Sequence, residues 1–161
     1  MTSRIASGIG YDIHPLVEGT GIWLGGVHIP CPYHLVGHSD ADALIHAICD
    51  ALLGAVSAGD IGEHFPPSDP QWANAPSQKF LTHVCDIVRE KGGLIQHVDT
   101  TIITEVPRLT PYKATMVQTL SHIMKIQINQ INIKATTSEK MGCIGRKEGL
   151  AALAIATVGI D

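Results

Sequence analysis

The apolar segment 150–160 places the strongest constraint on how this chain can fold. It is rich in Ala and in branched aliphatic residues and is uncharged, yet it is too short to cross a bilayer. We therefore expect it to form a strand buried in a sheet. Hydrophobic residues make up 45% of the 161-residue sequence, which is enough for a substantial core. Because no stretch is repetitive or disordered in composition, residues 1–161 are predicted to form a single domain.

The remaining sequence mixes strand-like and helix-like segments without a strict βαβ rhythm. Strands are expected over residues 4–14, 22–24, 27–29, 98–104, 128–135 and 150–159, with a Gly25-Gly26 turn joining the second and third. Helices are expected after a capping-box-like Ser39, after Ser77, and over 111–125, whereas the Pro-rich residues 62–76 are expected to form an irregular loop. This mixture predicts the α+β fold class, with helices packed on one face of a mixed sheet.

Charge and cysteine usage exclude several classes of protein. The formal net charge is −4 with only 11 Lys plus Arg, so we expect no nucleic-acid partner. No membrane partner is expected either, and Met1–Gly8 lacks the features of a signal or transit peptide. The four cysteines are scattered, which favours reduced thiols in a cytoplasm-like compartment. An acidic chain of this kind would need bound cations to accept a polyanionic substrate.

Three residues suggest a metal site. Asp12 and His14 lie two positions apart on an expected strand, so their side chains share one face. His46, in an expected helix, could supply a third donor. One carboxylate and two imidazoles suit Zn²⁺ and leave a fourth position open. The alternatives are a merely polar strand face and a hydrogen-bonded core histidine. Asp42, one helical turn before His46, is expected to cap the helix rather than to orient the imidazole.

Two polar segments could bind parts of a nucleotide. Residues 136–146 combine hydroxyls, a Gly-rich turn and cationic side chains, which could cradle phosphate or form an ordinary polar loop. Within it Glu139 could hold a hard cation such as Mg²⁺, or be a solvated surface residue. Residues 104–110 end a strand in a Pro-bounded turn, and their backbone groups could read the edge of a base.

Longer sequence blocks resemble the 2-C-methyl-D-erythritol 2,4-cyclodiphosphate synthase family. The matching blocks are GYDIH at 10–14, LGGVHIP at 24–30, HSDAD at 38–42, His46, DALLGA at 50–55, GDIG at 59–62, FPPSDP at 65–70, KATTSEK at 134–140, Gly145-Arg146 and Glu148-Gly149. The resemblance covers essentially the whole chain. It implies conversion of 4-diphosphocytidyl-2-C-methyl-D-erythritol 2-phosphate to the cyclic diphosphate with release of CMP. It also implies a homotrimer with active sites between subunits.

The resemblance assigns roles to individual residues. Asp12, His14 and His46 would bind Zn²⁺, and Glu139 would bind Mg²⁺ or Mn²⁺ together with the substrate phosphates. His38 and Thr137 would assist the transition state. The substrate, a cytidine diphosphate compound, would also contact Asp12, His14, Ser39, Asp60, Ile61, Gly62, Phe65, Pro66, Pro67, Ser68, Asp69, Thr104, Glu105, Val106, Pro107, Arg108, Leu109, Thr110, Thr136, Ser138, Cys143 and Arg146.

Three positions depart from the family pattern. Arg108 replaces a common Lys, Cys143 replaces a residue that is often aromatic, and Leu153 replaces the Glu that accompanies Arg146 where relatives bind an isoprenoid diphosphate on the threefold axis. We therefore do not expect that regulatory site. The compartment implied is the bacterial cytoplasm, or the plastid stroma for a mature processed chain. The alternatives to the synthase are a zinc-dependent phosphohydrolase and a non-catalytic nucleotide-binding trimer.

Overall fold

The long strand β1 (Arg4–Glu18) belongs to a five-stranded sheet, in which it lies between the short edge strand and the central strand. This computed structural model describes residues 4–161, so the first three residues of the Met1–Gly8 segment lie outside it. The sheet order is β4-β1-β7-β5-β6, where β4 is Tyr33–Leu35, β7 is Gly149–Ile160, β5 is Gly93–Ile103 and β6 is Ile131–Thr136. Only β5 and β6 pair in parallel. A separate hairpin pairs β2 (Ile22–Leu24) with β3 (Val27–Ile29).

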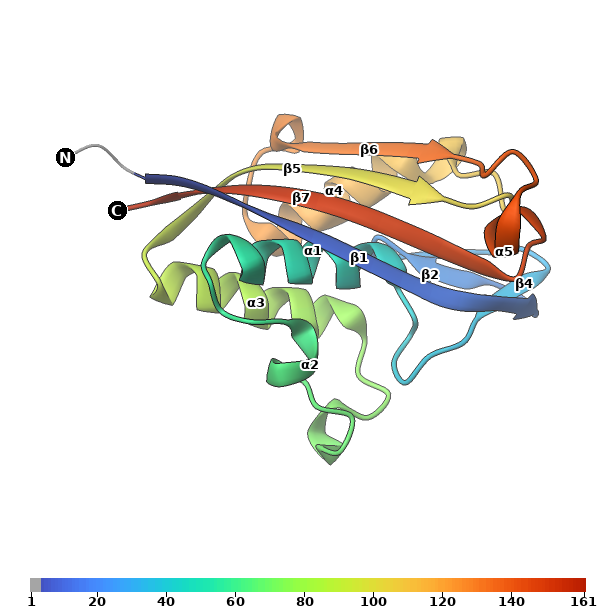
Figure 1. Cartoon of the computed structure of the whole chain (residues 1–161), viewed down its shortest axis with the longest axis horizontal. Helices are drawn as coiled ribbons and strands as arrows, with labels where there is room; N and C mark the ends of the chain where they lie inside the picture. The colour runs from blue at the N-terminus through green and yellow to red at the C-terminus, as the bar shows by residue number, and fades with distance from the viewer. Residues whose placement is uncertain (1–3) are drawn as a thin grey trace.

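The three long helices cover one face of the sheet (Figure 1). They are α1 (Ala43–Ala55), α3 (Ser77–Glu90) and α4 (Lys113–Met124). The core lies between these helices and the sheet, and α1 is buried along most of its length. The short helices α2 (Ile61–His64), α5 (Gly142–Gly145), η1 (Pro70–Trp72), η2 (Thr110–Tyr112) and η3 (Ile128–Gln130) lie in the connections. The predicted α+β fold class is confirmed.

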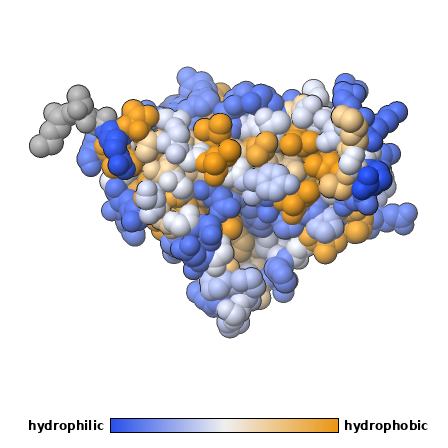
Figure 2. Space-filling view, in the orientation of Figure 1, coloured by the Kyte–Doolittle hydropathy of each residue, from blue (hydrophilic) through white to orange (hydrophobic). Residues whose placement is uncertain are grey.

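Alternation along β1 decides which residues face the helices. Gly8, Gly10, Asp12 and His14 pair with residues of β7 that are almost fully buried, so this set faces α1. At Gly10 an added Cβ would lie 1.8 Å from the Ala47 carbonyl oxygen, which shows how closely α1 approaches the strand. The intervening residues point to the other face of the sheet. There Ile5, Ile9 and Ile155 are exposed, and Figure 2 shows hydrophobic surface over β1 and β7.

The expected cap of the first helix at Asp42 is confirmed, whereas Ser39 and Ser77 do not cap the helices that they were expected to open. The first helix begins at Ala43 and is capped by Asp42, whose carboxylate accepts a hydrogen bond from Ile45 N at 3.0 Å; Ser39 lies before the cap. The cap of α3 is Pro76, and Ser77 is the first helical residue because its hydroxyl bonds elsewhere.

Three further elements differ from the prediction. Residues 62–76 are not wholly irregular, since they contain part of α2 and all of η1. Residues 128–130 form a 3-10 helix ahead of the expected strand, and the strand β4 was not predicted. Among residues 4–161, the structure has no helix that combines the length and the apolar character needed to cross a bilayer.

Candidate metal site and adjoining cavity

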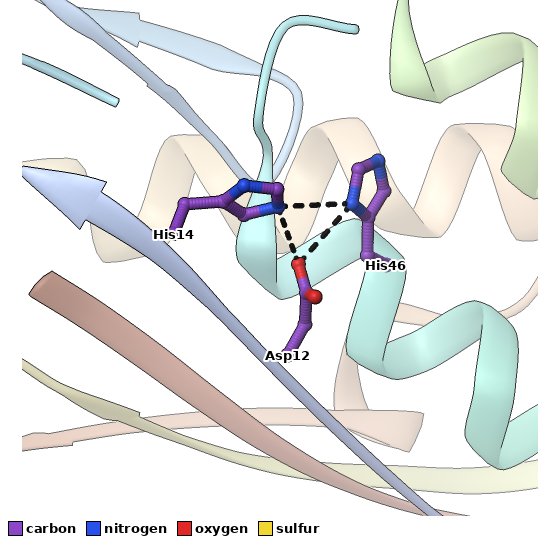
Figure 3. Close-up of side chains that lie close together, drawn as sticks. All are labelled: Asp12, His14 and His46. Carbon is purple, nitrogen blue, oxygen red and sulfur yellow. Dashed lines mark hydrogen bonds and ion pairs between the residues drawn. The ribbon is translucent and has the colours of Figure 1, made fainter. Parts of the chain in front are cut away.

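Three side chains from two elements converge at the centre of the site (Figure 3). Asp12 and His14 project from β1 and His46 projects from α1. The Asp12 Oδ2 atom lies 2.7 Å from His14 Nε2 and 3.2 Å from His46 Nδ1, and the two imidazole nitrogens are 3.3 Å apart. One donor atom from each residue lies within 4.8 Å of the other two, as a shared metal ion requires. The sequence prediction that these three residues meet is confirmed.

The ring nitrogen of each histidine that faces away from Asp12 also has a hydrogen-bond partner. His14 Nδ1 donates to the Val36 carbonyl oxygen at 3.0 Å, because a carbonyl can only accept. Its Nε2 atom therefore carries the free lone pair of the neutral ring and faces Asp12. His46 Nε2 lies 2.8 Å from the Ser77 hydroxyl oxygen, which leaves Nδ1 facing the same point. One carboxylate and two neutral imidazoles thus direct their lone pairs to the same point, and the outer hydrogen bonds fix the orientation of the rings. This arrangement fits a divalent metal ion.

Electrostatics within the group follow from its partial burial. Burial alone would raise the pKa of Asp12, but its hydrogen-bond and charge interactions with His14 and His46 outweigh burial and hold that pKa below its usual value. Burial alone would lower the pKa of His14, but its hydrogen bond and charge interaction with Asp12 raise that pKa above the usual range. In the metal-free protein the pair is thus stabilised as carboxylate and imidazolium, and a metal ion would displace the imidazolium proton.

A largely hydrophobic cavity of about 290 Å³ opens beside the donors. His14 and His46 form its metal-facing side, and His38 and Ser39 line it next to them. Its remaining walls are Ile61, Gly62, Phe65, Pro67, Asp69, Trp72, Ala73 and Phe80. The structure therefore gathers most of the residues predicted from blocks 38–39, 61–62 and 65–69. Pro66 and Ser68 belong to the same loop without lining the cavity.

Two carboxylates shape the loop that closes this cavity. Asp60 caps α2 through a 3.0 Å hydrogen bond from Glu63 N, and Asp50 accepts from Ile61 N at 2.8 Å. Burial is the main reason that the pKa of Asp50 is raised, with the nearby Asp60 charge adding to it. Trp72, Ala73 and Phe80 were missed as site residues by the sequence reasoning. Phe80 lies on the buried side of α3, and no local sequence pattern distinguishes a core aromatic from a cavity wall.

The other predicted site residues form a second group at the ends of β5 and β6. Because those strands are parallel, their carboxyl ends bring Thr104 next to Thr136, and Thr104 N donates to the Thr136 carbonyl oxygen at 3.0 Å. Glu105 Oε1 accepts from Ser138 N at 2.9 Å and from Lys140 N at 3.3 Å, so this carboxylate folds the 138–140 turn. Glu139 is exposed at that turn.

The rest of this second group lies around the same turns. Thr137 Oγ1 accepts from Glu139 N at 3.1 Å, and Thr104 Oγ1 donates to the Val106 carbonyl oxygen at 2.5 Å. Pro107, Arg108, Leu109 and Thr110 continue the first turn. Among residues 4–161, none of this group lines the 290 Å³ cavity. Of the outlying predicted residues, Cys143 lines a shallow pocket that includes His14, and Arg146 pairs with Glu148 at 2.8 Å.

Fold and site together define an α+β protein with a carboxylate–imidazole metal-binding group at the mouth of a hydrophobic cavity. The model of the YgbB family matches residues 5–159, so the chain belongs to that family. A 2-C-methyl-D-erythritol 2,4-cyclodiphosphate synthase from Nostoc sp. is 51% identical over 96% of this chain and 94% of its own length. A bifunctional enzyme IspD/IspF from Novosphingobium aromaticivorans is 55% identical over 94% of this chain, which spans only 39% of that protein.

A solved structure of IspF from Plasmodium falciparum, a CDP complex, superposes with a TM-score of 0.86 at 31% identity, covering 100% of this chain and 99% of that one. The chain therefore spans about two fifths of the bifunctional relative and nearly all of the single-function one.

Proposed function

We propose that this chain converts 4-diphosphocytidyl-2-C-methyl-D-erythritol 2-phosphate to 2-C-methyl-D-erythritol 2,4-cyclodiphosphate and releases CMP, a step of the non-mevalonate isoprenoid pathway. Residues 1–161 would form one synthase domain. The observation that carries the proposal is the convergent donor group Asp12, His14 and His46 beside a largely hydrophobic cavity. Membership of the YgbB family and the 51% identity to the Nostoc synthase support the same activity.

The reaction is an intramolecular displacement at phosphorus. An oxygen of the 2-phosphate attacks the β-phosphorus, the bond from that phosphorus to the oxygen bridging to CMP breaks, and the ring closes. The nucleophile is already anionic, so the main barrier is repulsion between two phosphates. Divalent ions, when bound, supply the positive charge that this acidic chain lacks. Holding both ends of one substrate favours ring closure over attack by water.

We assign Zn²⁺ to Asp12, His14 and His46, and Mg²⁺ or Mn²⁺ to Glu139 with the substrate phosphates. His38 and Ser39 lie beside the donors and would contact the diphosphate. The loop from Phe65 to Asp69 would cover the methylerythritol end, and its cavity-lining residues Phe65 and Pro67 would help to keep water out. At the second group, Thr136, Thr137, Ser138 and Arg146 would meet phosphate oxygens, and the backbone of 104–110 would bind cytosine.

A homotrimer would reconcile the two separate groups of site residues. Within one chain, the cavity and the 104–110 and 136–139 turns are distinct, so a single substrate would need the second group from a neighbouring subunit. The exposed apolar side chains on the outer face of β1 and β7 offer a surface for that association. We place this protein in a bacterial cytoplasm or a plastid stroma, consistent with its scattered free cysteines.

The proposal is tested by incubating the purified protein with the substrate and Mg²⁺ and following phosphorus by ³¹P NMR. The expected result is CMP and the cyclic diphosphate in equal amounts. Replacement of His46 by Ala should abolish turnover, and Glu139→Gln should weaken the Mg²⁺ dependence without loss of helical signal. CMP with a linear hydrolysis product would instead indicate a phosphohydrolase. Nucleotide binding without turnover, despite supplied metals, would indicate a binding protein.

A further inference from the structure

We propose that Asp40 and Ser77 act as a positioning pair that fixes the proton on the His46 ring and so turns the lone pair of Nδ1 towards the metal. This inference rests on the proposed metal site and extends it to two residues that the site itself does not contain. Ser77 begins α3 and Asp40 lies in the segment before α1. Their side chains meet on the far side of the His46 ring from Asp12.

The two nitrogens of His46 have different surroundings. Nδ1 lies 3.2 Å from Asp12 Oδ2 and 3.3 Å from His14 Nε2, inside the donor group. Nε2 lies 2.8 Å from Ser77 Oγ and 3.3 Å from Ser39 Oγ, outside it. The shorter contact identifies Ser77 as the main partner of Nε2. The ring therefore bridges the metal group and a hydroxyl.

The protons available to Asp40, Ser77 and His46 determine which group donates in each of their hydrogen bonds. An ionised carboxylate can only accept, so the hydrogen bond between Ser77 Oγ and Asp40 Oδ1 uses the single hydroxyl proton of Ser77. The Ser77 oxygen then has only lone pairs left for His46. At the shorter of the two Nε2 contacts, the one with Ser77, His46 is therefore the donor, which places the ring proton on Nε2. In the neutral ring this leaves Nδ1 unprotonated, and only that form can bind a metal through Nδ1.

Asp40 is held in place for this task by the backbone. Its Oδ2 accepts from Ser77 N at 2.9 Å, and its Oδ1 accepts from Asp42 N at 3.2 Å. Ser77 N has no acceptor within α3, and the cap residue Pro76 offers no side-chain bond, so Asp40 caps this helix from another segment. Ser77 is fully buried, which prevents water from replacing either contact. The Asp40 carboxylate thus caps α3 and also orients the Ser77 hydroxyl.

The two histidines use different acceptors for the same purpose. His14 Nδ1 donates to the Val36 carbonyl oxygen, a backbone group that substitution cannot remove. His46 depends on side chains, so its orientation can be altered by mutation. Partners of this kind contribute about 10- to 100-fold to metal affinity in other proteins. We expect Ser77→Ala to weaken zinc binding within that range.

Asp40→Asn gives a sharper result because it preserves shape. Asp40 Oδ1 accepts from both Ser77 Oγ and Asp42 N, so an asparagine NH₂ in that position donates to Ser77 Oγ and loses the Asp42 N contact. The hydroxyl proton of Ser77 is then free to turn towards His46 Nε2. Nε2 then becomes the acceptor and Nδ1 the protonated atom, which is the wrong form for the metal. The analogous Asp-to-Asn exchange in the serine-protease triad acts through the same change of tautomer.

The experiment measures zinc affinity by competition with a chromophoric chelator, and the His46 tautomer by long-range ¹H–¹⁵N NMR of the metal-free protein at alkaline pH. Variants are Ser77→Ala, Asp40→Asn and Ser77→Thr, which keeps a hydroxyl. The matched control is Ser121→Ala, which removes a hydroxyl hydrogen bond to the Ile126 carbonyl oxygen at the end of α4. Zinc binding by the wild-type protein tests the metal site separately from the positioning pair.

Supporting results are an Nε2-protonated His46 in the wild-type and Ser121→Ala proteins, an Nδ1-protonated ring in Asp40→Asn, and about 10- to 100-fold weaker zinc binding in Ser77→Ala, with recovery in Ser77→Thr. If Ser77→Ala does not fold, Asp40→Asn and Ser77→Thr decide the question. Wild-type zinc affinity and an unchanged tautomer in Asp40→Asn would overturn the pair while leaving the metal site intact. A wild-type protein that binds no zinc would overturn the site itself.

Discussion

Replacing Gly10 by Ala should damage both stability and metal binding, because this glycine sets the distance between β1 and α1. The added Cβ would lie 1.8 Å from Ala47 O and 2.9 Å from Ala51 N, whereas real Cβ contacts essentially never fall below 3.0 Å. Both neighbours are helix backbone and cannot rotate away. The helix must therefore move by at least about 1.2 Å relative to the strand.

The cost can be estimated from that displacement. Overpacking a core costs about 1–3 kcal/mol, and a clash with backbone places this change at the upper end of that range. Metal sites tolerate deviations of only about 0.2 Å in ligand distance. Since His46 moves with α1 while Asp12 and His14 stay on β1, zinc affinity should fall by at least about tenfold.

The matched control is Gly54→Ala in α1, where the added Cβ meets only Gly8 Cα, at 3.6 Å. That substitution should be neutral or stabilising by up to about 1 kcal/mol, because Ala is the better helix former. The assay is urea denaturation at one fixed subunit concentration, together with zinc competition. If Gly10→Ala matches the wild type in both measurements, the close packing of α1 on β1 is not what holds the donors together.

Three further predictions use the charges, thiols and surface. In the metal-free protein the raised pKa of His14 makes its stabilisation complete below about pH 6.5 and lost as pH rises through that raised value. The lowered pKa of Asp12 means that the stabilisation from this carboxylate is present above about pH 3.8 and is lost as pH falls through the lowered value. The urea midpoint should therefore be highest between about pH 3.8 and pH 6.5, and Asp12→Asn should flatten this pH profile. Burial raises the pKa of Cys85 to about 12, so at pH 8 a thiol reagent should label the exposed Cys143 quickly and Cys85 only after unfolding; equal rates in the native protein would contradict the buried assignment. Ile9→Glu, at a side chain that is 71% exposed on the outer sheet face, should shift light scattering from trimer to monomer while circular dichroism stays unchanged, and an unaltered mass would remove this face from the interface.

The strands and the metal donors were predictable because their signals are local. Alternation placed Asp12 and His14 on one face, and His46 was expected in a helix from which it could supply a third donor. Their meeting also required α1 to pack against β1, which follows from the small residues at Gly8 and Gly10 only once the sheet order is known.

The helix starts and the cavity walls were less accessible to sequence reasoning. Asp42 caps α1 as expected, but Ser77, which is also a good capping residue, gives its hydroxyl proton to Asp40 instead of capping α3. Local capping preference cannot anticipate a hydrogen bond from a residue 37 positions away. Trp72 was equally hidden, because a loop aromatic acquires its role only when the loop folds over its neighbours.

Because side chains alternate along β1, only the native pairing of β1 with β7 brings the metal donors together. Sliding β1 by one position against β7 would exchange its two faces, carrying Asp12 and His14 to the outer surface and pressing Ile13 against α1. A one-residue shift would remove both β1 donors from the site at once. Zinc would therefore bind only those chains in which β1 and β7 pair in the native register. Zinc added during refolding should therefore raise the fraction of molecules that have the native strand register and lower the fraction with a shifted one.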